Sequence, residues 1–256
     1  MGERLVIGFH AVTSRLRHAP GSVREIYFDA RRHDPRMRAL LELARGKGLR
    51  LMETDADRLD GLARGGRHQG VVARVEQGER ARDLGELLED LIEPALLLVL
   101  DGVQDPHNLG ACLRVADAFA AHGVIVPRDR AAGITATVEK VASGAVETVP
   151  FFPVTNLART LRELKERGVW VVGAVEDAEG DLFGARLQGP LAWVLGAEGE
   201  GLRRLTAETC DERVAIPMLG AVESLNVSVA AGICLFETRR QRRAAGASGG
   251  GSKPLD

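Results

Sequence analysis

From residue 94 onwards, short apolar segments alternate with amphipathic ones, and this alternation restricts the possible folds more than any other feature of the chain. Residues 95–101, ALLLVLD, form a continuous apolar run, which is typical of a strand covered on both faces. Further strands are expected at 123–127, 149–152, 169–175, 191–195 and 213–216, and helices at 107–120, 135–142, 156–167, 201–208 and 225–243. The pattern predicts an α/β fold in which helices cover both faces of a parallel sheet.

The first 77 residues follow another pattern and are expected to form a small α/β domain of their own. Strands are predicted at 25–29, 49–53 and 70–75, a helix at 35–44, and a flexible basic loop at 61–70. Residues 78–93 are polar and are expected to be a linker with a short helix at 84–91. The larger domain then spans 94–243, and the Gly/Ser-rich tail 244–256 is predicted to be disordered.

Charge is distributed unevenly along the chain, although the net charge is only −2. Residues 1–78 carry 15 basic and 10 acidic side chains, a net charge of +5, whereas residues 79–256 carry −7. A basic surface of this kind suits the phosphates of a nucleic acid. However, 30 of the 34 basic residues are arginine, so a coding bias would give the same asymmetry.

The composition excludes several other classes of protein. Hydrophobic residues make up 45% and charged residues 27% of the chain, as in ordinary soluble proteins. No run approaches the roughly 18 apolar residues that a membrane span needs, and the N-terminus lacks the apolar core of a secretory signal. Three widely spaced cysteines, Cys112, Cys210 and Cys234, predict neither a disulfide framework nor a zinc site, and they fit a reducing cytoplasm.

A glycine-dense turn, GAEGEG at 196–201, follows the strand predicted at 191–195. Parallel sheets bind ligands where their strands end, so this turn is a candidate binding loop. It lacks the third glycine of a dinucleotide fingerprint, because Arg204 occupies that position, and the chain has no P-loop motif. Glu198 and Glu200 would repel a pyrophosphate and suit a cationic or hydroxyl-bearing ligand. An ordinary strand-to-helix turn would use the same glycines.

A second loop, IPMLGAVESLNVS at 216–228, leads into a strongly apolar helix. Ser224, Asn226 and Ser228 cluster where this helix is expected to start. Serine and asparagine are preferred N-caps, so capping alone would account for them. The polar start of a buried helix would equally provide donors and acceptors at the mouth of a site.

A third segment, DPHNLGACLRVADAFA at 105–120, predicts a capped turn followed by a helix. The core-facing stripe of this helix consists of Leu109, Leu113, Ala116 and Ala120. Arg114 lies off the stripe, where a solvated surface residue is the common outcome. A cation directed at a ligand is the alternative.

Four segments, in their order and spacing, resemble the SpoU-type RNA 2′-O-methyltransferases of the SPOUT class. They are DPHNLGACLRVADAFA (105–120), KVASGAVETVP (140–150), VLGAEGEGL (194–202) and IPMLGAVESLNVSVAAGICLFE (216–237). In the front domain, IGFHAV (7–12) and RHQGVVA (67–73) resemble the RNA-binding substrate domain of part of this family. The resemblance covers nearly the whole chain except its tail. It is strongest to enzymes that methylate a guanosine in the peptidyl-transferase P loop of 23S ribosomal RNA.

The resemblance implies a fold, a methyl donor and an assembly. The C-terminal domain is expected to be a SPOUT methyltransferase domain with a trefoil knot, an exception to the rule against knots. S-adenosyl-L-methionine is the expected donor, held against Gly196, Ile216 and Leu225 without a metal. The expected partners are 23S rRNA, bound through the front domain, and a second copy of the chain. In the implied homodimer, formed through the methyltransferase domains, Arg114 can serve the other copy's site.

The resemblance also implies the catalytic residues: Arg114, together with Asn108, Glu198, Ser224 and Asn226, which would orient Arg114, the ribose and the donor. A ribose hydroxyl is a poor nucleophile, so its proton must leave or its developing alkoxide must be stabilised. Family mechanisms make Arg114 the base, but a guanidinium group resists deprotonation. We therefore interpret Arg114 as stabilising the alkoxide and binding the adjacent phosphate, and we leave the base unassigned.

Other functions stay open at this point. The same chemistry on transfer RNA or at another rRNA position would leave these motifs unchanged, because the motifs do not encode the modified nucleotide. A non-catalytic RNA-binding factor is a second alternative, although the intact set of five implied catalytic residues argues against it. A nicotinamide-dependent oxidoreductase is disfavoured by the missing glycine fingerprint.

Overall fold

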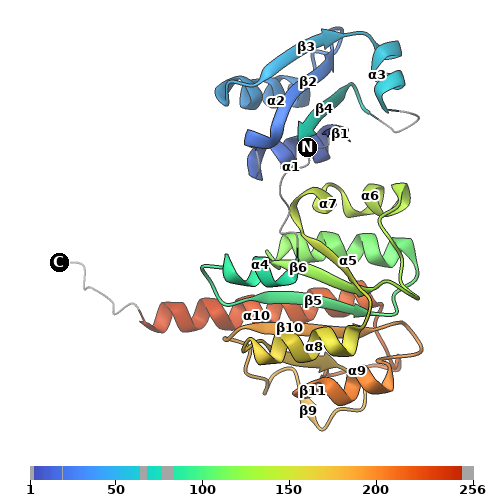
Figure 1. The fold of residues 1–256 in the computed structure, drawn as a ribbon, viewed down its shortest axis with the longest axis vertical. Coiled ribbons are helices and arrows are strands. Elements are labelled where there is room, and N and C mark those ends of the chain that lie inside the picture. The colour runs from blue at the N-terminus through green and yellow to red at the C-terminus, as the bar shows by residue number, and fades with distance from the viewer. Residues whose placement is uncertain (1–2, 19, 64–67, 77–82, 250–256) are drawn as a thin grey trace, which may run out of the picture. The chain divides into compact units, whose positions relative to one another are not determined.

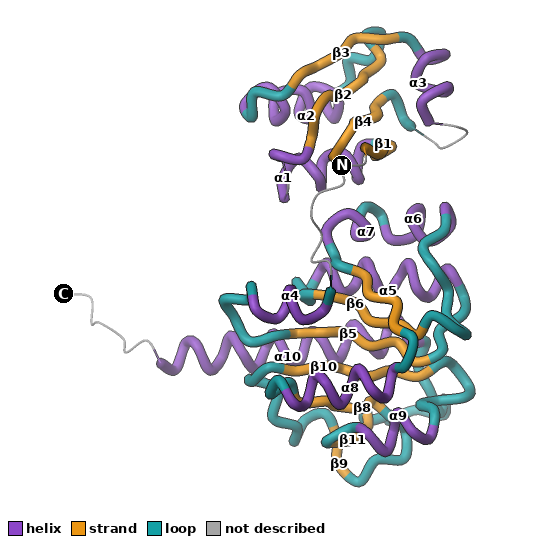
Figure 2. Tube along the Cα trace, in the orientation of Figure 1, coloured by secondary structure: helices purple, strands orange, loops and turns teal. Residues whose placement is uncertain are grey.

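The computed structural model describes residues 3–18, 20–63, 68–76 and 83–249, and it divides into two compact units (Figures 1 and 2). The front unit comprises Met1–Arg82 with the segment Ser143–Thr148, and the back unit comprises Asp83–Ala142 and Val149–Asp256. A linker was expected at 78–93, but the residues from Asp83 onwards belong to the back unit. The remaining residues of this linker, 78–82, lie outside the described part of the chain.

The front unit is built on a four-stranded sheet in the order β1-β4-β2-β3. Its strands are β1 (Glu3–Ile7), β2 (Val23–Asp29), β3 (Arg50–Thr54) and β4 (Val71–Glu76). Strands β1 and β2 run antiparallel to β4, and β3 runs parallel to β2. Strand β1 was not predicted, because its five residues begin with a charged pair and show no alternation.

Helices cover both faces of the front sheet. They are α1 (Phe9–His18), the 3-10 turn η1 (Pro20–Ser22), α2 (Pro35–Gly46) and α3 (Ala56–Ala63). Helices α1 and α2 share one core with Ile26 and Phe28, whereas α3 packs on Tyr27 and Val72 on the other face. Alternate residues of a strand point to opposite faces, so β2 supplies both cores. The basic loop expected at 61–70 is shorter than predicted, since α3 extends to Ala63; residues 64–67 lie outside the described part.

The back unit contains a seven-stranded sheet in the order β7-β6-β5-β10-β8-β11-β9. Its strands are β5 (Leu96–Asp101), β6 (Gly123–Pro127), β7 (Phe151–Val154), β8 (Trp170–Ala174), β9 (Gly180–Asp181), β10 (Leu191–Gly196) and β11 (Glu212–Ala215). Every neighbouring pair is parallel. The predicted parallel sheet is therefore confirmed.

Two helical layers cover this sheet, as Figure 1 shows. Helices α4 (Leu84–Glu89) and α8 (Leu157–Glu166) pack on one face, and α9 (Arg204–Thr209) lies beside α8. The other face carries α5 (Pro106–Ala118) and α10 (Val227–Gly249), with α6 (Ala136–Ala142) against α5. The short helix α7 (Ala145–Thr148) precedes β7. In the described part of the chain, no helix combines the length and the apolar character needed to cross a bilayer.

Helix α10 extends beyond the end predicted for it. The tail was expected to be disordered from residue 244, but α10 continues to Gly249, and residues 250–256 lie outside the described part. The guanidinium of Arg242 donates to the carbonyls of Pro94 (2.7 Å), Ala95 (2.8 Å) and Gly189 (2.7 Å), which fixes this end of the helix to the sheet. After Arg242 the helix continues through three alanines, which favour a helix, and two glycines, which do not.

Candidate active site

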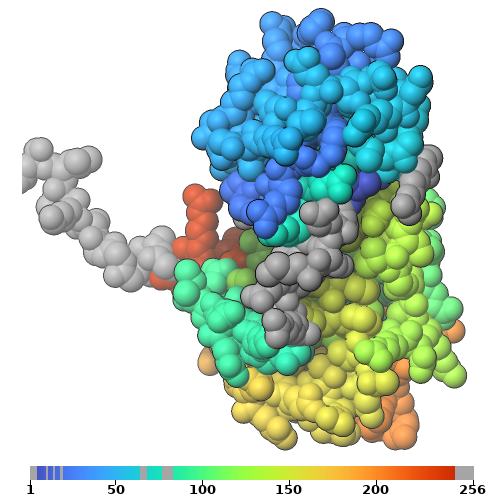
Figure 3. All heavy atoms as spheres, turned by 45° about the horizontal axis from the view of Figure 1, so that its top comes forward, coloured from blue at the N-terminus to red at the C-terminus, as the bar shows by residue number. Residues whose placement is uncertain are grey.

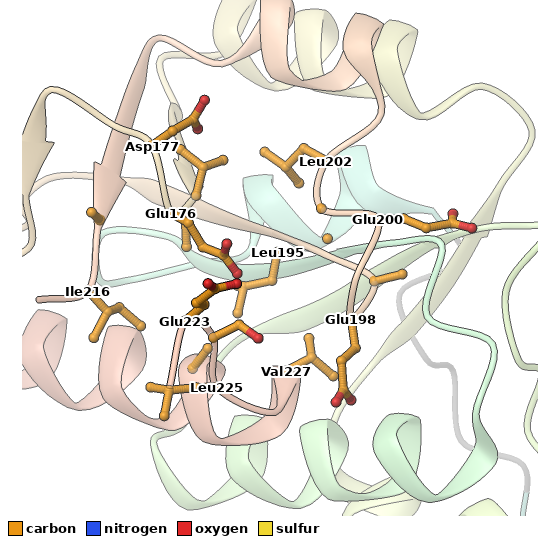
Figure 4. Close-up of a pocket in the computed structure, with 18 of the residues that line it drawn as sticks. Glu176, Asp177, Leu195, Glu198, Glu200, Leu202, Ile216, Glu223, Leu225 and Val227 are labelled. Atoms are coloured by element: carbon orange, nitrogen blue, oxygen red, sulfur yellow. The ribbon is translucent and has the colours of Figure 1, made fainter. Parts of the chain in front are cut away.

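A cavity of about 840 Å³ lies where strands of the back sheet end. Strands β8, β10 and β11 are parallel, so their carboxyl ends share one edge of the sheet, and the start of α10 closes the cavity (Figure 4). Its lining comes mainly from 174–177, 195–202, 215–218 and 223–225. This volume is in the range of small-molecule sites, which is roughly 300–1,000 Å³.

The turn after β10 brings two backbone segments unusually close together. Its chain folds back so that Gly201 N donates to Ala197 O at 2.9 Å, and Gly199 and Gly201 have φ of 79° and 64°. A Cβ atom added to Gly196 would lie 2.1 Å from the carbonyl carbon and oxygen of Gly201. Only glycine fits at position 196 with this backbone.

An ion pair with a buried carboxylate holds the far end of the same turn. Asp101, the last residue of β5, is 1% exposed. Its carboxylate accepts hydrogen bonds from Arg203 N at 3.0 Å and Arg203 Nε at 2.6 Å. These bonds compensate the buried carboxylate and fix the turn to the neighbouring strand.

The cavity is lined by negative charge. Of its described lining residues, five are acidic and one, Arg213, is basic; the acidic ones are Glu176, Asp177, Glu198, Glu200 and Glu223. Figure 4 shows the carboxylates of Glu176 and Glu223 directed towards the middle of the cavity, whereas Glu200 points away. Such a lining attracts a cation and opposes a phosphate.

Apolar side chains form the rest of the wall. Leu195, Leu202, Ile216, Leu225 and Val227 line the cavity beside the carboxylates (Figure 4). A ligand with a flat apolar ring and a separate positive charge would match both parts of this lining.

The structure brings five of the eight predicted site residues to the cavity. Gly196, Glu198, Ile216, Ser224 and Leu225 line it. The other three predicted residues, Asn108, Arg114 and Asn226, do not belong to the lining.

Asn226 links the starts of α5 and α10. Its Nδ2 donates to Asn108 Oδ1 at 2.8 Å, across 118 positions of sequence. Its Oδ1 accepts from Ser228 N at 3.0 Å, and its carbonyl accepts from Val229 N and Ala230 N. Asn226 therefore caps α10, as one reading of the sequence suggested, and holds Asn108 as well.

Arg114 lies on the exposed side of α5. Within the described part of the chain its guanidinium makes neither a hydrogen bond nor a salt bridge. A single copy of the chain thus leaves Arg114 away from the cavity lining and free to contact another molecule.

Sequence reasoning missed Glu176, Asp177 and Glu223 as lining residues. The first two follow directly after β8, at the same edge of the sheet as the glycine turn. The rule that ligands bind at the carboxyl ends of parallel strands would have indicated them.

Comparison with known proteins links both units to one activity. Residues 95–236 match the model of the SpoU rRNA Methylase family, and residues 5–81 match the model named RNA 2′-O ribose methyltransferase substrate binding. The 23S rRNA (guanosine-2′-O-)-methyltransferase RlmB of Ralstonia nicotianae is 62% identical over 240 residues, which cover 94% of this chain and 96% of that protein. Its namesake from Nitrosomonas europaea is 63% identical over 239 residues, which cover 93% and 92%.

A solved structure is similar over the same extent. The SpoU methyltransferase AviRb from Streptomyces viridochromogenes, in complex with the cofactor AdoMet, is 29% identical in sequence. The alignment covers 95% of this chain and 92% of that chain, with a TM-score of 0.71.

Proposed function

The chain belongs to the SpoU rRNA Methylase family, and we propose that it transfers a methyl group from S-adenosyl-L-methionine to the ribose 2′-hydroxyl of a guanosine in 23S rRNA. The observation that carries the proposal is the 62% identity, over 94% of the chain, to a protein named for this reaction. The match extends through the front unit, which is where substrate recognition is expected. We assign the target guanosine to the P loop of the peptidyl-transferase centre.

The chemistry of the cavity supports this donor. S-adenosyl-L-methionine carries a sulfonium and an ammonium group beside a flat adenine ring, and it supplies an electrophilic methyl group when bound. Glu176 and Glu223 offer negative charge to its cations, and Leu195, Ile216 and Leu225 offer apolar surface to its ring. The contact between Gly196 and the following turn would place backbone groups close to it. We assign Gly196, Ile216 and Leu225 to donor binding.

The remaining predicted residues are assigned to the ribose. Arg114 would place its guanidinium beside the developing alkoxide and the neighbouring phosphate, where fixed positive charge stabilises the transition state. Asn108 and Asn226, which are already hydrogen-bonded to each other, would hold the ribose at the start of the two helices. Ser224 and Glu198, which both line the cavity, would orient the donor and Arg114. The group that accepts the hydroxyl proton is unassigned.

We further propose that the enzyme works as a homodimer joined through the back unit. Large apolar side chains are exposed on α10 and the loop before it: Val229 (49%), Phe236 (56%), Val222 (63%) and Leu219 (99%). Val229 and Phe236 are two helical turns apart and lie on the same side of α10. Exposed apolar patches of this kind are typical of interfaces. Arg114 lies on α5, which packs against α10, so an interface here would bring it to the other copy. A ribosomal RNA substrate would place this dimer in the cytoplasm.

Methyl transfer to defined RNA tests the proposal directly. Purified protein, S-adenosyl-L-methionine with a labelled methyl group and a 23S rRNA transcript are combined, and the 2′-O-methyl position is mapped. We expect one methylated guanosine, and the same position unmethylated in rRNA from cells that lack the protein. The Arg114→Ala variant is the control, since it leaves the cavity lining unchanged and should bind the donor without methylating RNA. Incorporation into transfer RNA, or into a base, would contradict the proposal.

A further inference from the structure

The two helical faces of the front unit carry opposite charge. On α2 and the turn after it, exposed basic residues outnumber acidic ones by four to one: Arg36, Arg38, Arg45 and Lys47 against Glu42. On the other face, α3 and the residue before it carry three exposed acidic side chains and one basic one: Asp55, Asp57 and Asp60 against Arg58. The separate cores of the two helices place them on opposite sides of the sheet.

The four cations of the α2 face, defined as Arg36, Arg38, Arg45 and Lys47, are not neutralised within the described structure. Three other arginines of the front unit are paired: Arg24 with Glu76, Arg31 with Asp29, and Arg32 with Asp34. None of the four on the α2 face forms a salt bridge with a described residue. Their charge is therefore available to a ligand.

Helix stability alone does not explain this arrangement. Positive charge is favourable in the last turn of a helix, where Arg45 lies, and unfavourable in the first. The first turn of α2 contains Arg36 and no acidic residue. Asp34, the N-cap, accepts from Arg36 N at 3.1 Å and Met37 N at 3.2 Å, and Arg32 is already paired with it. Within the described structure, only the N-cap carboxylate, which is shared with Arg32, offsets positive charge at this end of α2.

The spacing of the charges suits an extended polyanion. Arg38 and Arg45 are seven residues apart, so they lie on the same side of α2, about 10 Å apart along its axis. Lys47 adds a further cation directly past the end of the helix. Figure 3 shows the surface of the front unit in blue to cyan.

We propose that the front unit binds the RNA phosphate backbone through the α2 face, and that the α3 face is turned away from RNA. The inference rests on the proposed RNA substrate and goes beyond it by choosing between two faces of the domain. Phosphates are repelled by Asp55, Asp57 and Asp60 and attracted by the α2 cations, so charge alone orients the domain on a nucleic acid.

The salt dependence of RNA binding tests this choice of face. The probe is the 23S rRNA transcript that the wild-type protein methylates, and the dissociation constant is measured over a series of salt concentrations. For Arg38→Gln and Arg45→Gln we expect weaker binding, and a slope of log Kd against log salt that falls by about 0.7–0.9 for each lost phosphate contact. Arg58→Gln, which removes an exposed helical arginine from the α3 face, is the matched control and should keep the wild-type slope.

Two accompanying measurements separate the possible failures. Donor binding should be unchanged in all three variants, because the substituted side chains are exposed and remote from either core. The melting temperature should fall by at most a few degrees in Arg45→Gln, which loses a favourable charge in the last turn of α2. Suppose that the wild type methylates the transcript, but the slope of log Kd against log salt falls no more in Arg45→Gln than in Arg58→Gln. RNA binding through the α2 face is then contradicted, while the proposed function stands. If the wild type neither binds nor methylates the transcript, the proposed function itself fails.

Discussion

Arg114 combines a proposed catalytic role with a position on the exposed side of α5. Its guanidinium offers several donors in a fixed planar fork, whereas the lysine ammonium group offers a point charge. For Arg114→Lys we therefore expect turnover to fall by about 10²-fold, the scale of a lost alkoxide donor, with donor affinity unchanged. Single-turnover kinetics as a function of pH, with donor binding by calorimetry, would measure both. Near-normal turnover in the lysine variant would show that the fork is not essential and that the role is misassigned.

Gly196 is the residue at which the donor cavity tolerates least change. In Gly196→Ala the new methyl group would meet the backbone of Gly201 at 2.1 Å, so the turn must move. We expect a loss of about 1–3 kcal/mol in the free energy of unfolding, typical of overpacking, and weak donor binding. Gly220→Ala is the control, since a Cβ there has no neighbour within 4 Å. Equal stability and donor affinity in the two variants would rule out the close approach described here.

Single residues also show the limit of sequence reasoning. The glycine turn and the polar cluster at 224–228 were recognisable as candidates, yet capping and ligand binding could not be separated for Asn226. The decisive contact is its hydrogen bond to Asn108, which depends on two helices meeting. No local pattern encodes a contact between residues 118 positions apart.

At the scale of elements, a small polar cluster joins α10 to the start of β5. His122 Nδ1 accepts from Leu96 N at 2.9 Å, and its Nε2 lies 2.9 Å from Glu93 Oε1. Arg239 donates to both oxygens of Glu93 and to the carbonyl of Phe119 at 2.8 Å. The pKa of His122 is lowered, chiefly by burial; Glu93 opposes this shift, and Arg239 and Arg242 add to it.

This cluster predicts a loss of stability in mild acid. The unfolded chain takes up a proton at the ordinary histidine pKa of 6.5, and folded His122 does so only at lower pH. The contribution of His122 to the free energy of unfolding is therefore complete above pH 6.5 and is lost as the pH falls below this value. Protonation at Nδ1 would also remove the acceptor for Leu96 N.

Denaturant unfolding between about pH 8 and pH 5 checks this effect. We expect the free energy of unfolding of His122→Asn to fall less steeply with decreasing pH than that of the wild type, because asparagine offers an acceptor that does not titrate. His107→Asn, at an exposed histidine, should keep the wild-type profile. If the free energy of unfolding depends on pH in the same way in wild type and His122→Asn, His122 is not the group that causes the loss of stability in acid.

Elements differed in how far they could be predicted. The strands β5 and β10 were evident because they are apolar throughout and buried on both faces. Helix α3 was missed because it is short and highly charged and buries only Leu59 and Ala63. Helix α1 was also missed: its first four residues entered only through the segment IGFHAV that resembles the substrate domain, and no helix was predicted there. Tertiary packing, more than local pattern, determines elements of this kind.

For the whole molecule, the proposed homodimer makes a specific prediction. Arg114→Ala and Glu198→Ala are each expected to be inactive, but mixing them should restore activity if Arg114 acts on the other copy's cavity. In a mixed dimer one site then combines an intact cavity with an intact Arg114. Random exchange between symmetric dimers would restore up to about one quarter of wild-type activity. The methyl-transfer activity of the mixture measures this recovery. If the subunits are shown to exchange and activity does not recover, Arg114 acts in the site of its own chain.

The architecture as a whole was predictable only in part. Alternation of strands and helices was enough for a parallel sheet, because each segment carries its own periodicity. The strand order, in which β10 lies between β5 and β8, depends on how connections cross the sheet. The trefoil knot implied by the resemblance stays a prediction for the same reason, since threading leaves no trace in periodicity.

The acidic wall of the cavity has a consequence for selection among metabolites. Adenosine is also part of ATP, which shares its ring and sugar with the proposed donor. Contacts to adenosine cannot distinguish the two, but a triphosphate placed among Glu176, Glu198 and Glu223 would be strongly disfavoured, whereas a sulfonium would not. We therefore expect these carboxylates to exclude ATP from the pocket by charge repulsion.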